Sequence, residues 1–188
     1  MANPDGFPAI PGATLPEPAA CLRVVVMGVA GCGKSAVGRL IAQQLGLPLI
    51  EGDDFHPPGN VEKMQRGVPL TDDDRAGWLQ TLAAELARHG GGAVLTCSAL
   101  KRAYRDRLRQ AASPLHFVYL GITEAESLRR VAQRAGHFYP ASLVASQFAA
   151  LQDPSGEPGV LTLDGSAPLT DLGQRAAHWL AATPHSFQ

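Results

Sequence analysis

The chain has 188 residues, enough for one α/β domain with a substantial core but too few for the second domain of a motor ATPase. Hydrophobic residues make up 45% of it and charged residues 18%, a balance typical of a globular protein in water. The 16 Lys and Arg residues nearly cancel the 17 Asp and Glu residues, so the overall charge predicts neither nucleic acid nor a membrane surface as a partner.

The segment 1–20 contains five prolines and shows no hydrophobic periodicity, which predicts a flexible N-terminal extension before a single domain over 21–188. It lacks the basic and then apolar pattern of a secretory leader, and no apolar stretch of the chain approaches the ~20 residues that span a bilayer. Cys21, Cys32 and Cys97 form no CxxC pair, and their odd number favours reduced thiols. We therefore expect a cytoplasmic protein.

An apolar run over 22–27 predicts a strand buried on both faces of a parallel sheet. The next eight residues match the phosphate-loop pattern G-x-x-x-x-G-K-[ST], and a helix begins at about Lys34. Glycines allow the loop to turn its N–H groups inward, and the start of the helix adds further unpaired N–H groups. The alternative is a glycine-rich turn that binds nothing, which the complete motif disfavours. The residues expected to contact a nucleotide are Gly28, Val29, Ala30, Gly31, Cys32, Gly33, Lys34, Ser35 and Ala36.

Within this loop, Lys34 supplies a mobile cation for the outer phosphates, and the Ser35 hydroxyl is a candidate ligand for Mg²⁺. The helix that follows ends at Gly46 and Pro48, and a second strand is predicted over 47–50. This alternation indicates a parallel sheet with its site at the carboxyl ends of the strands.

Acidic residues follow the second predicted strand directly. Carboxylates there would face the γ-phosphate, where one of them could accept a hydroxyl proton or hold water on Mg²⁺. A solvated acidic turn is equally consistent with these residues. Further on, 61–66 predicts a short helix, and Thr71 or Asp72 caps a longer one that buries Trp78. Arg75 on that helix is either a surface charge or an anion-binding group.

A third strand is predicted over 93–97, but it lacks the terminal Asp with which motor ATPases and GTPases hold their metal. The segment 98–109 is strongly basic. A solvated helix face is its ordinary interpretation, and nucleic acid is disfavoured because aromatic residues are not interleaved with the charges. Its first turn is better placed to meet a small anionic substrate.

The remaining elements complete an α/β domain with a five-stranded parallel sheet and helices on both faces. Strands are predicted over 115–120 and 160–163, and helices over 124–134 and 141–151, with a last helix near the C-terminus. Between the two helices, glycine and proline predict a lid around 134–142 with Arg134 at its base, although an ordinary surface loop is the alternative. Asp164 lies in a loop that commonly borders the base of a nucleotide.

Five stretches of the chain, in this order, resemble the gluconokinase family, whose fold is related to shikimate and nucleoside-monophosphate kinases. They are MGVAGCGKS, GDDFHPPGNVEKM, GVPLTDDDRAGWL, CSALKRAYRDRLR and RAGHFYPASLVASQFAALQDP. The resemblance implies a P-loop kinase that uses ATP and Mg²⁺ to phosphorylate the 6-hydroxyl of D-gluconate. It also implies a homodimer.

The resemblance further assigns roles to individual residues. Asp53 would bind and deprotonate the 6-hydroxyl, with Lys34 and the lid residue Arg134 completing the catalytic set. The chain departs from the family at Cys32, where serine is common, and at Glu51, where the family has Asp. Residues expected to line the sugar-acid pocket are Asp53, His56, Lys63, Arg75, Ser98, Lys101, Tyr104, Arg105 and His137.

Two other functions share the phosphate loop. One is a related kinase with another small acceptor, such as shikimate or a nucleoside monophosphate. The other is a nucleotide-dependent switch, which the missing metal-binding Asp and the absence of the guanine motif N-K-x-D disfavour.

Overall fold

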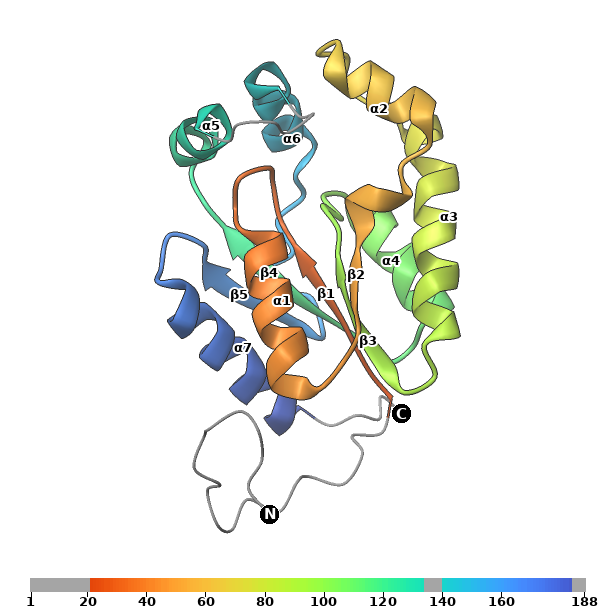
Figure 1. Cartoon of the computed structure of the whole chain (residues 1–188), viewed down its shortest axis with the longest axis vertical. Helices are drawn as coiled ribbons and strands as arrows, with labels where there is room; N and C mark the ends of the chain where they lie inside the picture. Colours follow the sequence, from red (N-terminus) through yellow and green to blue (C-terminus); the bar gives the residue numbers. More distant parts are fainter. Residues whose placement is uncertain (1–20, 134–139, 184–188) are drawn as a thin grey trace, which may run out of the picture.

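The computed structural model describes residues 21–133 and 140–183. Its centre is one parallel sheet with the strand order β2-β3-β1-β4-β5 (Figure 1). The predicted α/β class with five parallel strands is therefore confirmed. The strands are β1 (Leu22–Met27), β2 (Leu49–Glu51), β3 (Gly92–Thr96), β4 (Leu115–Gly121) and β5 (Val160–Asp164).

Helices form the two outer layers and a third group beyond the strand ends. α1 (Lys34–Leu45) packs with α7 (Leu169–Ala182) on one face, and α3 (Asp72–Arg88) packs with α4 (Arg102–Ala111) on the other (Figure 1). Beyond the carboxyl ends of the strands lie α2 (Pro58–Gln65), α5 (Glu124–Ala132) and α6 (Val144–Ala150), with short 3₁₀ turns at η1 (Gly52–Phe55) and η2 (Ala141–Leu143). None of the helices in the described ranges is both long and apolar enough to cross a membrane.

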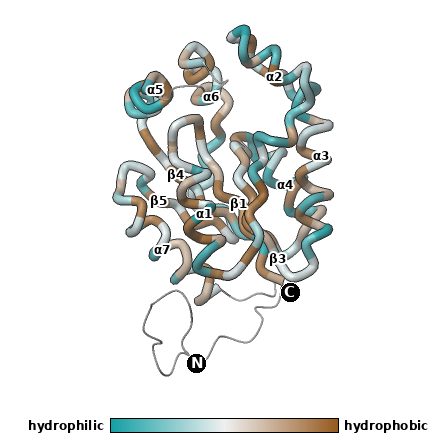
Figure 2. Tube along the Cα trace, viewed as in Figure 1, coloured by the Kyte–Doolittle hydropathy of each residue, from teal (hydrophilic) through white to brown (hydrophobic). Residues whose placement is uncertain are grey.

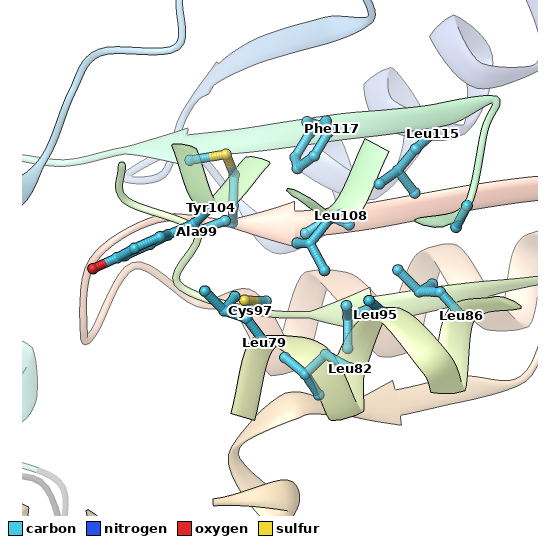
Figure 3. Packing of buried hydrophobic residues seen from close by; sticks show 14 of the residues in the cluster. Leu79, Leu82, Leu86, Leu95, Cys97, Ala99, Tyr104, Leu108, Leu115 and Phe117 are labelled. Atoms are coloured by element: carbon cyan, nitrogen blue, oxygen red, sulfur yellow. The ribbon is translucent and has the colours of Figure 1, made fainter. Parts of the chain in front are cut away.

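The central strand β1 is buried on both faces. Val25 and Met27 belong to the core cluster under α3 and α4, whereas Val24 and Val26 belong to the cluster under α1 and α7. Side chains alternate across a strand, so a wholly apolar run is the pattern that two covered faces require. Figure 2 shows this as a hydrophobic centre between more polar helices, and Figure 3 shows the packing between β3 and α3, around Leu82 and Leu95.

Several element boundaries differ from those that the sequence predicts. α2 begins at Pro58, because proline is well suited to the first turn of a helix, where its missing N–H costs nothing. The helix predicted over 141–151 is divided into η2 and α6. The predicted N-terminal extension and most of the predicted lid lie outside the described residues.

Arg105 holds two loops together from inside the protein. Its side chain is fully buried, and its five N–H groups all have acceptors in the described structure. They reach the carbonyl oxygens of Ala99, Leu100 and Gln152 and both carboxylate oxygens of Glu157. A buried guanidinium with every donor paired contributes to the fold because its removal leaves acceptors without partners.

We therefore predict that Arg105→Met lowers the free energy of unfolding by about 3–5 kcal/mol, the cost of breaking a buried ion pair. The matched control is Arg102→Met, whose side chain is 69% exposed and pairs with Asp106 at 3.7 Å. Such surface pairs contribute little, so the control should change stability by less than about 0.5 kcal/mol. Urea unfolding followed by circular dichroism measures both, and equal losses in the two variants would contradict the structural role of Arg105.

Candidate active site

A cavity of about 360 Å³ opens at the carboxyl edge of the sheet. It joins the phosphate loop to the turn after β2, to the start of α3 and to α5 and α6. Its lining residues are Ala30, Gly31, Gly33, Lys34, Ser35, Ala36, Asp53, His56, Met64, Leu70, Arg75, Trp78, Ser98, Arg130, Val131 and Gln147.

The phosphate loop has the backbone that an anion cradle needs. Gly28, Gly31 and Gly33 have φ values of 140°, 76° and 100°, and Gly33 is the N-cap of α1 without any side-chain cap. A Cβ at Gly28 would lie 2.7 Å from the carbonyl oxygen of Leu120, so the loop leaves β1 along a path open only to glycine. The N–H groups at the start of α1 have no side-chain cap, and the residues that carry them line the cavity, an arrangement that suits a phosphate.

Lys34 and Cys32 point in different directions from this loop. The Lys34 ammonium lines the cavity and donates to the carbonyl oxygens of Gly28 at 3.1 Å and Val29 at 3.0 Å. Cys32 is buried in the α1–α7 core, and its Sγ lies 2.8 Å from the position of a Cβ at Gly28. The thiol that replaces the family's serine therefore packs inside the protein rather than lining the cavity.

Glu51, whose role the sequence leaves open, binds the hydroxyl that is the candidate Mg²⁺ ligand. Its carboxylate oxygen Oε2 accepts from Ser35 Oγ at 3.0 Å and from Thr96 Oγ1 at 2.7 Å. Thr96 ends β3, where GTPases and motor ATPases carry an acid. The next residue, Cys97, cannot replace that acid because burial raises its pKa to about 12. Among the described side chains here, Glu51 is the carboxylate that is hydrogen-bonded to the candidate metal ligand.

The side of the cavity that is expected to bind the phosphoryl acceptor is built on η1 and α3. Asp53, His56, Arg75 and Ser98 all line it, so four of the predicted pocket residues are brought together. The His56 ring stacks on Trp78, with ring centroids 4.2 Å apart and planes 13° from parallel. Trp78 is anchored in turn because its Nε1 donates to the carbonyl oxygen of Gly52 at 2.8 Å.

Gly52 allows the turn after β2 to lie close to the sheet. A Cβ at Gly52 would lie 2.2 Å from the carbonyl oxygen of Thr96, which no side chain can tolerate. The turn after β2 therefore lies directly against the end of β3, and Asp53 follows at the rim of the cavity.

Burial lowers the pKa of His56, although the negative charge of Asp53 opposes the shift and the positive charge of Arg75 adds to it. Desolvation disfavours the charged imidazolium, so His56 is neutral at pH 7. A neutral imidazole has one donor and one acceptor nitrogen, which suits the binding of hydroxyl groups.

Other predicted pocket residues are held outside the cavity lining by partners of their own. Lys63 Nζ lies 2.6 Å from Asp74 Oδ1, and this contact is the main reason that the pKa of Asp74 falls to about 2. Lys101 Nζ lies 2.6 Å from Asp72 Oδ1, and the Tyr104 hydroxyl donates to the same carboxylate.

Arg105 and Asp164 also lie outside the cavity lining. Arg105 uses all its donors inside the protein. Asp164 accepts from the backbone N–H and hydroxyl of Ser166 at the end of β5. Arg134 and His137 belong to the residues that the structure does not describe.

The cavity also contains residues that the sequence analysis did not select. Arg130 donates to the carbonyl oxygens of Gly31 at 3.3 Å and Gly165 at 3.0 Å, and so connects the phosphate loop to the loop after β5. Gln147 accepts from the backbone N–H of Ala30 at 2.6 Å. Periodicity could not have revealed either one, because both interactions join segments far apart in the chain.

The fold and the site together define the class of protein. A phosphate loop follows the central strand of a five-stranded parallel sheet, and the cavity beside it holds a carboxylate, a neutral imidazole and a guanidinium. This is the arrangement of a P-loop kinase rather than of a motor or GTPase, because the metal-binding acid at the end of β3 is replaced by Thr96 and Cys97.

Comparison with known proteins identifies the family. A family model described as an AAA domain matches residues 24–158. The chain is 48% identical to a gluconokinase of Gluconobacter oxydans over 76% of this chain and 82% of that protein. It is 43% identical to a thermoresistant gluconokinase of Escherichia coli over 77% of this chain and 85% of that protein. A gluconokinase crystal structure from Sinorhizobium meliloti matches with a TM-score of 0.79 and 46% identity, covering 86% of this chain and 93% of that one. The chain belongs to the gluconokinase family.

The environment of His56 predicts how this ring titrates. The midpoint of its NMR titration in the folded protein should lie below the ordinary histidine pKa of 6.5. A peptide of residues 53–59, titrated in the same way, serves as the unfolded reference. Because the folded protein binds fewer protons than the unfolded chain between the two midpoints, stability should fall as the pH drops through this range. The resonance is assigned by its absence from His56→Gln. A midpoint above that of the peptide would mean that charge, rather than burial, dominates at this position.

Proposed function

We propose that this protein is a gluconokinase, which transfers the γ-phosphoryl group of ATP to the 6-hydroxyl of D-gluconate and produces 6-phospho-D-gluconate and ADP. The observation that carries the proposal is the continuous cavity that joins the phosphate loop to Asp53, His56 and Arg75. Phosphoryl transfer requires the two reactants in one water-poor space with their reacting atoms in line. The gluconokinases that the chain resembles support this choice of acceptor.

The phosphate end of the site is proposed to act by positioning and electrostatics. Backbone N–H groups of the loop and of the start of α1 would hold the phosphates, as the uncapped helix start suggests. Lys34 would exchange its hydrogen bonds to two loop carbonyl oxygens for hydrogen bonds to outer phosphate oxygens. The phosphate oxygens are negatively charged and therefore bind an ammonium group more strongly. Arg134 is proposed as the lid cation from the family resemblance, and Asp164 as a neighbour of the nucleotide base.

The residues near the phosphate loop fit the Mg²⁺ ion that the family implies. Mg²⁺ takes oxygen ligands and uses few protein groups, because substrate phosphates and water supply the rest. Ser35 offers a hydroxyl oxygen, and the Glu51 carboxylate beside it can hold a metal-bound water. The ion, when bound, would neutralise charge that develops on the transferred group.

At the acceptor end, Asp53 is proposed to bind the 6-hydroxyl and to accept its proton. Arg75 is proposed to pair with the gluconate carboxylate, while neutral His56 and Ser98 bind hydroxyl groups. The resemblance adds His137 from the lid. Lys63, Lys101, Tyr104 and Arg105 have no part in the proposed contacts because the structure pairs them elsewhere. The cytoplasmic location and homodimer remain part of the proposal.

The proposal is tested by measuring ADP release with gluconate, shikimate, a nucleoside monophosphate and no acceptor. We expect kcat/KM for gluconate to exceed that of the other acceptors by at least about 10²-fold, since a polar site rejects molecules that leave its groups unpaired. Lys34→Ala is the negative control for contaminating kinases. Comparable rates with another acceptor, or ADP release independent of any acceptor, would overturn the assignment.

Asp53→Asn tests the proposed base separately from the phosphate loop. The change keeps the size of the side chain but removes its charge, so kcat should fall by about 10²-fold or more while the Kd for ATP changes little. The control is Asp54→Asn, an exposed neighbour outside the cavity lining, which should retain activity. Recovery of the Asp53→Asn activity at high Mg²⁺ would instead assign this carboxylate to the metal, and normal kcat at every Mg²⁺ concentration would exclude both roles.

A further inference from the structure

Two helices hold one residue of the phosphate loop, one through its carbonyl group and the other through its N–H. Ser127 on α5 donates its hydroxyl to the carbonyl oxygen of Ala30 at 2.7 Å. Gln147 on α6 accepts the backbone N–H of the same residue at 2.6 Å through its Oε1. α5 and α6 contact each other beyond the strand ends (Figure 1), and along the chain they flank the segment predicted as a lid. Ala30 is therefore tied to both sides of that segment.

Ala30 lies next in the chain to the loop residues that Lys34 contacts. The Lys34 ammonium, which in phosphate loops reaches the β- and γ-phosphates, lies within 3.1 Å of the carbonyl oxygens of Gly28 and Val29. Ala30 follows Val29 directly, so the Ala30 N–H and the side chain bound to it lie near this end of the cradle. Gln147 also lines the same cavity as Asp53, the proposed base.

The hydrogen bond to Ala30 decides which way the Gln147 amide faces. A backbone N–H can only donate, so the side-chain atom that receives it must be the oxygen. The Gln147 NH₂ group then points away from Ala30 with two N–H donors. No described residue accepts from this group, and the half-buried side chain lines the cavity.

We propose that Gln147 binds the γ-phosphate of ATP through its side-chain NH₂ while its oxygen holds the Ala30 N–H. This inference rests on the proposed ATP-dependent phosphoryl transfer. Gln147 would then distinguish ATP from ADP without adding a charge to the site. Gln147 transfers no proton, because a side-chain amide is neither an acid nor a base near neutral pH. The α6 helix gains a direct contact with the group that is transferred.

The competing interpretation is that Gln147 only braces the loop, and two variants separate the two roles. Gln147→Glu keeps an oxygen that accepts from Ala30, so the brace survives, but it replaces the NH₂ donor with a negative oxygen. Gln147→Met removes both the brace and the donor with little change in length. The matched control is Gln174→Glu, which makes the same change in charge on an exposed position of α7.

The test measures Kd for ADP and for the non-hydrolysable β,γ-imido analogue of ATP, both with Mg²⁺, together with the melting temperature. We expect Gln147→Glu to weaken the ATP analogue by about tenfold or more and ADP by less than about threefold, since a charge-assisted hydrogen bond is replaced by repulsion from the γ-phosphate. Gln147→Met should also weaken the ATP analogue more than ADP. The Gln174→Glu control should change neither affinity.

Equal weakening of the two nucleotides in Gln147→Met, with normal affinities in Gln147→Glu, would show that Gln147 is a brace and would overturn the proposal. Unchanged affinities in both variants would overturn it as well. If Gln147→Glu unfolds before its affinities can be measured, Gln147→Met decides between the two roles. A greater loss of affinity for the ATP analogue than for ADP supports the proposal, and an equal loss overturns it. These measurements contain no sugar acid, so they stand even if the wild-type protein fails to phosphorylate gluconate, which would refute the proposed function alone.

Discussion

The site depends on the burial of β1 on both faces. This strand lies between β3 and β4, and its apolar side chains are covered by helices on either side, so it cannot shift along the sheet without exposing them. The loop that follows must therefore emerge at a defined height at the carboxyl edge. Gly28 makes the turn possible at a point where any side chain would collide with Leu120. The position of the phosphate cradle is thus set by the core.

Charged residues near the site divide into those that hold the scaffold and those that remain available to a ligand. Arg105 is fully paired inside the protein, and Lys63 and Lys101 each face an aspartate at 2.6 Å. The two lysine pairs tie α2 and the start of α4 to α3. Lys34 and Arg75 bond mainly to backbone carbonyls, which a charged phosphate or carboxylate can replace. Neutral carbonyls thus keep these two cations in place without neutralising them.

A carboxylate from the neighbouring strand lies beside the end of β3, the position where GTPases and motor ATPases carry a metal-binding acid. Glu51 reaches across from β2 to the Ser35 hydroxyl and is held by Thr96, which occupies the end of β3. This contact is possible because parallel strands end at one edge of the sheet, where side chains from different strands meet. The phosphate loop is likewise connected to α5 and α6 by Ser127, Arg130 and Gln147, so the walls of the site and the cradle form one bonded unit.

The sequence by itself determined the strands, the phosphate loop and the family, because these depend on local periodicity and on residues close together in the chain. It also located Asp53, His56, Arg75 and Ser98, which the structure gathers around one cavity. It could not distinguish Arg105 from a ligand-binding arginine, nor find Gln147, whose partner is 117 residues away. The identity of a charged or amide residue in the sequence does not reveal whether its partner is a ligand or another part of the protein. Only the tertiary structure, which brings distant segments together, decided between the two.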